Sequence, residues 1–122
     1  MGSILLVDDE PALLHGIGRY LTGLGHEVTS AANGREAIEA LARTTPDVLI
    51  TDINMPDMDG IELLNALRAR ESRLPVIAMS GGGHFDKRLL LASARMLGAV
   101  FTLEKPFELD ELRRLVEQAL SG

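Results

Sequence analysis

Polar side chains that could do chemistry come at the ends of short apolar runs in this sequence. Asp8 and Asp9 follow the first run, Asp52 and Ser80 end two later runs, and Lys105 follows the last. A carboxylate can act as a nucleophile, a lysine supplies a positive charge, and a hydroxyl can donate to a newly bound oxygen. Two simpler interpretations are open: Asp52 starts a turn, and Asp8–Asp9 cap a helix.

The rest of the sequence predicts the elements that would position these side chains. Apolar runs predict strands at residues 3–7, 26–31, 48–52, 75–80 and 99–104, and helical spacing predicts helices at about 11–24, 33–42, 61–67, 86–97 and 109–120. Strands that alternate with helices indicate an α/β fold with a doubly wound, five-stranded parallel sheet, (β/α)5. All strands of such a sheet end at the same edge, so we expect the five polar side chains to lie together.

Three carboxylates at one edge of a sheet would repel one another unless a cation binds between them. Mg²⁺ prefers a few carboxylates together with waters and a phosphate oxygen. We predict that Asp9 and Asp52 are direct ligands, that the backbone carbonyl of Asn54 is a third, and that Asp8 holds a metal-bound water. A carboxylate nucleophile, a divalent cation, a lysine and a hydroxyl are the groups needed to accept a phosphoryl group.

Composition excludes several other classes of protein. The formal net charge of −6 argues against direct binding of nucleic acid, which needs a basic face. The chain has no cysteine, which rules out disulfides and thiolate metal sites and suits the reducing cytoplasm. No apolar run approaches the ~20 residues that span a bilayer, so no membrane partner is expected. With 46% apolar residues and no linker, residues 1–122 are expected to form one domain.

The segments that carry these side chains resemble a known family. They are ILLVDDE at 4–10, DINMPDMDG at 52–60, MSG at 79–81 and KPF at 105–107. In this order and register they resemble a response-regulator receiver domain of two-component signalling, which has a CheY-like (flavodoxin-like) fold with strand order 2-1-3-4-5. The resemblance implies that Asp52 is the phosphoacceptor, that Asp8 and Asp9 are the acidic pair that binds the required Mg²⁺, and that Ser80 and Lys105 assist.

The resemblance also implies partners. The phosphoryl group would come from a sensor histidine kinase or a histidine phosphotransfer protein. A downstream effector protein or effector domain would read the result from the face made by the fourth helix, fifth strand and fifth helix, and a weak phosphorylation-dependent dimer is allowed. Such a domain assists its own phosphorylation and dephosphorylation without being a turnover enzyme. Leu89–Leu91 on the fourth predicted helix fits either a docking patch or an ordinary wide apolar face.

Two features depart from the usual pattern of the family. Thr102 stands where an aromatic residue usually lies, three positions before the lysine. Phe101 is one position earlier and should point to the opposite face of the sheet, which argues against an aromatic switch. The segment from Ser80 to Lys105 is also longer than usual, and we predict unusual mobility for its glycine-rich start, Gly81–Gly83.

Two other functions use a similar fold or similar chemistry. A phosphatase of the haloacid dehalogenase type would need a second aspartate two residues after the nucleophile, where this chain has Asn54. A flavodoxin-like cofactor binder would need a phosphate-cradling loop after the first strand and aromatic residues beside the ring. The sequence has an acidic loop at that place and only 3% aromatic residues.

Overall fold

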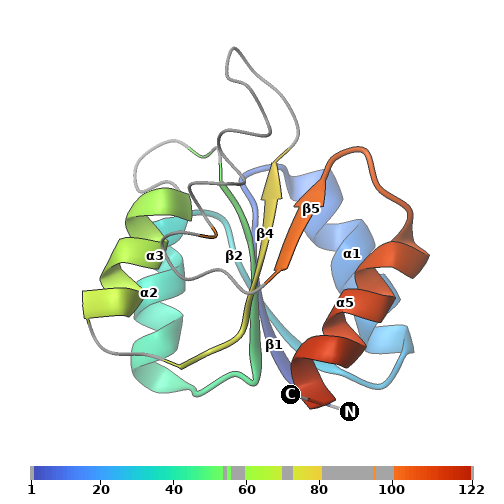
Figure 1. Cartoon of the computed structure of the whole chain (residues 1–122), viewed down its shortest axis with the longest axis horizontal. Helices are drawn as coiled ribbons and strands as arrows, with labels where there is room; N and C mark the ends of the chain where they lie inside the picture. The colour runs from blue at the N-terminus through green and yellow to red at the C-terminus, as the bar shows by residue number, and fades with distance from the viewer. Residues whose placement is uncertain are drawn as a thin grey trace.

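Five parallel strands form one sheet at the centre of the computed structural model (Figure 1). The structure describes residues 2–53, 55, 60–69, 73–80, 95 and 101–121. The strands are β1 (Ser3–Val7), β2 (Glu27–Ala31), β3 (Val48–Asp52), β4 (Val76–Ser80) and β5 (Phe101–Glu104), in the order β2-β1-β3-β4-β5. The predicted parallel sheet and its order 2-1-3-4-5 are therefore confirmed.

Helices cover both faces of the sheet, as expected for a doubly wound fold. They are α1 (Pro11–Gly23), α2 (Gly34–Arg43), α3 (Gly60–Ala69) and α5 (Leu109–Ser121). Helices α1 and α5 lie on one face and α2 and α3 on the other (Figure 1). The fourth predicted helix, 86–97, lies outside the described residues except for Arg95, which is helical. None of the described helices is both long enough and apolar enough to cross a bilayer.

Alternation along the strands gives each face of the sheet its own apolar core. Leu5 and Val7 of β1 pack toward α2 and α3, whereas Ile4 and Leu6 pack toward α1 and α5. All four side chains are almost completely buried. A strand covered on both faces is apolar at every position, which is why the sequence shows continuous runs.

Local sequence signals set the ends of the helices. Pro11 is the first residue of α1, where its missing N–H costs little. The Asn33 side chain accepts from the backbone N–H of Glu36 at 2.9 Å and so caps α2. The Glu36 carboxylate accepts in turn from the N–H of Ala32 at 3.0 Å, one residue earlier than in a standard capping box.

Two apolar residues at the ends of helices predicted from helical spacing are exposed. Leu24 is 40% exposed because α1 has already ended at Gly23, and Gly25, with φ of 98°, turns the chain away. Leu109, the first residue of α5, is 41% exposed. Further along α5, Leu112 and Val116 are fully buried.

Candidate functional site

The register of the sheet brings the predicted site residues to one edge. Val7 is paired with Thr51, so Asp8, which follows β1, lies beside Asp52, the last residue of the neighbouring strand β3. The last strand joins the same edge because the backbone N–H of Lys105 donates to the carbonyl of Ser80 at 2.8 Å. The ends of β1, β3, β4 and β5 therefore bring three kinds of side chain to one place: carboxylates, a hydroxyl and an amine.

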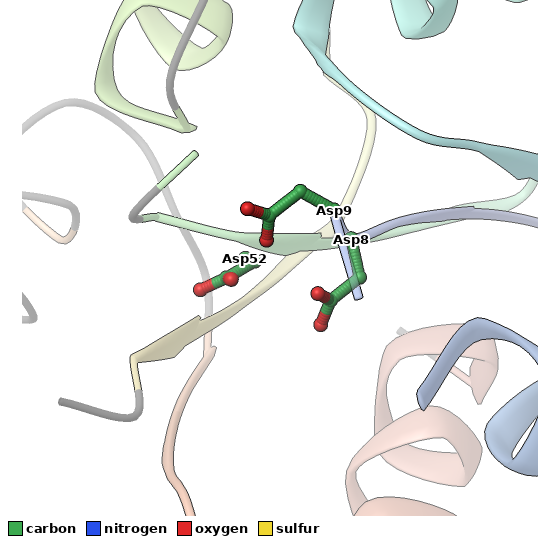
Figure 2. Close-up of side chains that lie close together, drawn as sticks. All are labelled: Asp8, Asp9 and Asp52. Carbon is green, nitrogen blue, oxygen red and sulfur yellow. The ribbon is translucent and has the colours of Figure 1, made fainter. Parts of the chain in front are cut away.

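The three predicted carboxylates come together there. One oxygen from each of Asp8, Asp9 and Asp52 lies within 4.8 Å of the other two, and Figure 2 shows them gathered at the ends of β1 and β3. Asp8 is fully buried and Asp52 is only 4% exposed, whereas Asp9 is exposed to solvent. Buried carboxylates are stable only when they are paired or bind a cation.

Lys105 supplies the positive charge that these buried carboxylates need. Its Nζ lies 2.9 Å from Asp8 Oδ2 and 3.4 Å from Asp52 Oδ2, with the side chain 12% exposed. Burial by itself would lower the pKa of Lys105, but the hydrogen bond to Asp8 and the charges of Asp52 and Asp8 together outweigh it and raise that pKa above its ordinary value. The amine therefore stays charged at neutral pH.

Asp8 is held rigidly between two donors. Its Oδ1 accepts from the backbone N–H of Glu10 at 3.0 Å, and its Oδ2 accepts from Lys105. Glu10, not Asp8 or Asp9, is the N-cap residue of α1, and its side chain makes no capping hydrogen bond. The helix-capping interpretation of the acidic pair is thus not supported. Glu10 also places a carboxylate oxygen 3.9 Å from Lys105 Nζ, a contact that the sequence analysis missed.

Ser80 presents a polar atom that is not satisfied within the described part of the chain. The residue is fully buried, and its Oγ has no hydrogen-bond partner there. A buried hydroxyl without a partner is costly, of the order of 1–3 kcal/mol, so its presence calls for an explanation. A ligand oxygen at this edge of the sheet would supply the missing acceptor. The Lys105–Pro106 peptide bond is cis.

Phe101 and Thr102, neighbouring residues of β5, have separate surroundings. Phe101 packs against the core beneath α1 and α5, which confirms that it points away from the face on which Thr102 lies. The Thr102 hydroxyl accepts a hydrogen bond from the Arg95 guanidinium at 2.8 Å. Nothing in the sequence pattern indicated this contact. The other predictions at this end of the sheet, for Asn54, Gly81–Gly83 and Leu89–Leu91, lie outside the described residues.

The donor set fits a hard divalent cation. The described residues offer three carboxylates, and oxygen ligands of this type suit Mg²⁺ rather than a softer metal. Asp9 is the carboxylate best placed to act as a ligand without losing another contact, because it makes no ion pair in the described part of the chain. Asp8 is already bonded to Lys105, which suits it to a water-mediated contact.

Comparisons with known proteins point to one family. The model of the response regulator receiver domain matches residues 4–117. DNA-binding transcriptional regulator NtrC of Escherichia coli K12 is 43% identical over 120 residues, which are 98% of this chain and 25% of that protein. Sporulation initiation phosphotransferase F of Bacillus subtilis is 32% identical over 117 residues, 96% of this chain and 92% of that protein. The chain thus spans about a quarter of the length of its NtrC relatives.

Solved structures agree with this result. The receiver domain of the Francisella response regulator 1452 superposes with a TM-score of 0.90 at 30% identity, covering 99% of this chain and 98% of the other. The receiver domain of NtrX from Brucella abortus gives a TM-score of 0.88 at 32% identity, covering 97% and 98%.

Proposed function

The chain belongs to the response regulator receiver family, and on that premise we propose that Asp52 accepts a phosphoryl group from a phosphohistidine. The donor would be a sensor histidine kinase or a histidine phosphotransfer protein in the cytoplasm. The observation that carries the proposal is the position of Asp52: a nearly buried carboxylate at a strand end, 3.4 Å from a charged lysine and beside two further carboxylates. A turn residue would need none of these neighbours.

The proposed reaction is an in-line transfer between two nucleophiles. A carboxylate oxygen of Asp52 forms a bond to phosphorus while the bond from phosphorus to the donor histidine nitrogen breaks. The electron pair of the broken bond stays on that imidazole nitrogen, and the product is an acyl phosphate on Asp52. Asp52 is suited to this step because it lies at the end of β3, at the edge of the sheet, with its Oδ2 3.4 Å from the charged Lys105.

Lys105 and Ser80 would stabilise the charge that arrives with the phosphoryl group. Lys105 already pairs with Asp52, and its raised pKa keeps it cationic during the transfer. The buried hydroxyl of Ser80 has no acceptor within the described residues and could donate to a phosphoryl oxygen. Transfer would thus give this hydroxyl an acceptor that the described residues do not supply.

A divalent cation would be held by Asp9 and Asp52, by Asp8 through a water and by the backbone carbonyl of Asn54. When bound, Mg²⁺ offsets negative charge on the transferring group. The chain's own contribution is to hold Asp8 and Asp9 at the end of β1, next to Asp52.

We propose that phosphorylation changes partner binding at the face formed by residues 86–97, β5 and α5. A receiver domain is a signalling module, so the added charge must favour one of two conformations that differ in affinity for an effector protein, an effector domain or a second copy. The relay cannot run through an aromatic side chain at position 102, because that residue is Thr102 and its hydroxyl is bonded to Arg95.

Incubation with acetyl phosphate tests the proposed chemistry. We expect the chain to gain one phosphoryl group in the presence of Mg²⁺ and none in excess EDTA, measured by intact-protein mass spectrometry. The group should be released by hydroxylamine, which cleaves acyl phosphates and leaves phosphoserine intact. Rapid turnover of unrelated phosphoesters would instead support the phosphatase alternative.

Metal binding should also appear as a change in stability. For a cation at about ten times its Kd, mass action gives about 1.4 kcal/mol, or a rise in Tm of about 5 °C for a domain of this size. We expect this rise with MgCl2 and not with NaCl of the same ionic strength. Asp9→Asn should abolish it and leave the protein at least as stable as the wild type without Mg²⁺, because one of three mutually repelling charges is gone. An unchanged Mg²⁺ response in Asp9→Asn would show that the cation binds elsewhere.

A further inference from the structure

A groove with a volume of about 470 Å³ lies between helix α1 and strand β2, and none of the candidate site residues that the structure describes lines it. Leu14, Gly18 and Thr22 line it from successive turns of α1, and Val28 and Ser30 line it from β2. Gly18 and Gly23 both line the groove, and a Cβ at either position would meet no atom within 4 Å. A larger side chain at either position would partly fill the space.

Strand β2 is the outermost strand on this side of the sheet. The backbone groups of Glu27 and Ala31 make hydrogen bonds inward, toward the segment that contains β1. The intervening residues Val28 and Ser30 therefore direct their N–H and C=O groups outward, as alternate residues do at an open sheet edge. These are the two residues of β2 that also line the groove.

The rim of the groove carries one positive charge, that of Arg19. His15 and Arg19 lie one helical turn apart on α1 and are both exposed. Arg19 makes no ion pair within the described part of the chain, and no acidic side chain lines the groove. The charge at this groove is therefore opposite in sign to the net charge of the whole chain, which is −6. It favours an acidic occupant.

We propose that the groove, called here the α1–β2 groove, binds an extended acidic segment of a partner protein, which adds to the sheet as a strand beside β2. The backbone of the segment would pair with Val28 and Ser30, as in β-augmentation. Side chains on one face of a strand are ~6.6 Å apart, and residues four positions apart on a helix are ~6 Å apart along its axis. Alternate side chains of the added segment would therefore meet successive turns of α1. A carboxylate on that face reaches Arg19.

A pair of model peptides tests this proposal on the unphosphorylated chain. The probe is a fluorescein-labelled peptide of alternating threonine and glutamate, and its control has lysine in place of glutamate. We expect anisotropy to show binding of the glutamate peptide alone. In ¹⁵N-labelled protein the largest amide shifts should fall on Val28 and Ser30. A probe with a central proline, which lacks an N–H for strand pairing, should bind more weakly.

Two variants separate the groove from helix stability. Gly18→Leu fills the groove and should abolish binding, whereas Gly16→Leu makes the same change on α1 at a glycine that also has open space but does not line the groove. Both should gain helix stability, because leucine is the better helix former. Arg19→Glu should weaken binding about tenfold, the loss expected for one charge-assisted contact.

Three results would overturn the proposal. The first is no binding of the glutamate peptide, and the second is equal binding by Gly18→Leu and Gly16→Leu. The third is sedimentation that shows a dimer paired through β2, because the occupant would then be a second copy of this chain. None of these results depends on phosphorylation of Asp52, so they leave the proposed function untouched.

Discussion

Asp52→Asn should accept no phosphoryl group from acetyl phosphate under conditions in which the wild-type chain is modified. The asparagine amide has nearly the shape of the carboxylate but lacks the charged oxygen that would attack phosphorus. We expect the loss to be complete by intact-protein mass spectrometry, with no hydroxylamine-labile product. Because Asp52 lies in a cluster of acidic residues, the variant should fold, and circular dichroism can confirm this.

A matched control is available on the same strand. Asp47 comes directly before β3, at the opposite end from Asp52, and is exposed. Its Oδ2 accepts from the backbone N–H of Ser3 at 2.8 Å, a contact that an asparagine oxygen can also make. Asp47→Asn should therefore be phosphorylated like the wild type. Full phosphorylation of Asp52→Asn would show that another residue is the acceptor.

The sequence was sufficient to predict the arrangement of the sheet and the edge at which the site lies. Buried parallel strands leave a simple signal, continuous apolar runs such as residues 4–7, and the fold rules then bring all strand ends together. Asp8, Asp9, Asp52 and Lys105 were predicted to meet for this reason, and they do. No distances were needed for that inference.

Contacts that depend on the packing of two elements could not be predicted in this way. The Arg95–Thr102 hydrogen bond requires a helical residue to lie against β5, and no periodicity in the sequence encodes that distance. The exposure of Leu24 has a similar origin, because the helical spacing continues to Leu24 although α1 ends at Gly23 and Gly25 then turns the chain away. The sequence also predicted Lys105 at the same edge of the sheet as the carboxylates, without indicating that Asp8 would be its nearest partner.

Lys105→Met should be the most destabilising of the proposed substitutions. Methionine matches the length of the lysine stem but leaves Asp8 and Asp52, both nearly buried, without their shared counter-charge. Removing one partner of a buried ion pair typically costs about 3–5 kcal/mol, and the lower end is expected here because Lys105 is 12% exposed. Urea unfolding at neutral pH in the presence of EDTA would measure the difference.

A surface ion pair provides the comparison for this measurement. Arg113 pairs with Asp110 at 2.6 Å and with Glu117 at 2.8 Å on the exposed side of α5. The hydrogen bond from Arg113 is the largest cause of a lowered pKa for the Asp110 carboxyl, and the hydrogen bond from Arg114 is the second largest. Because solvent screens these charges, Arg113→Met should change the free energy of unfolding far less than Lys105→Met. An equal loss of unfolding free energy in Arg113→Met and Lys105→Met would mean that burial does not make the Lys105 ion pairs more important than the surface pairs.

The dependence on pH gives a second, independent measure of the Lys105 ion pairs. The pKa of Lys105 is raised in the folded chain, so the stability that it contributes is fully present below the ordinary lysine pKa and is lost as pH rises through the raised value. The difference in unfolding free energy between wild type and Lys105→Met should therefore stay constant from neutral pH up to the ordinary lysine pKa. It should shrink only as the pH rises above that value. A difference that already narrowed near neutral pH would contradict a charged lysine held between Asp8 and Asp52.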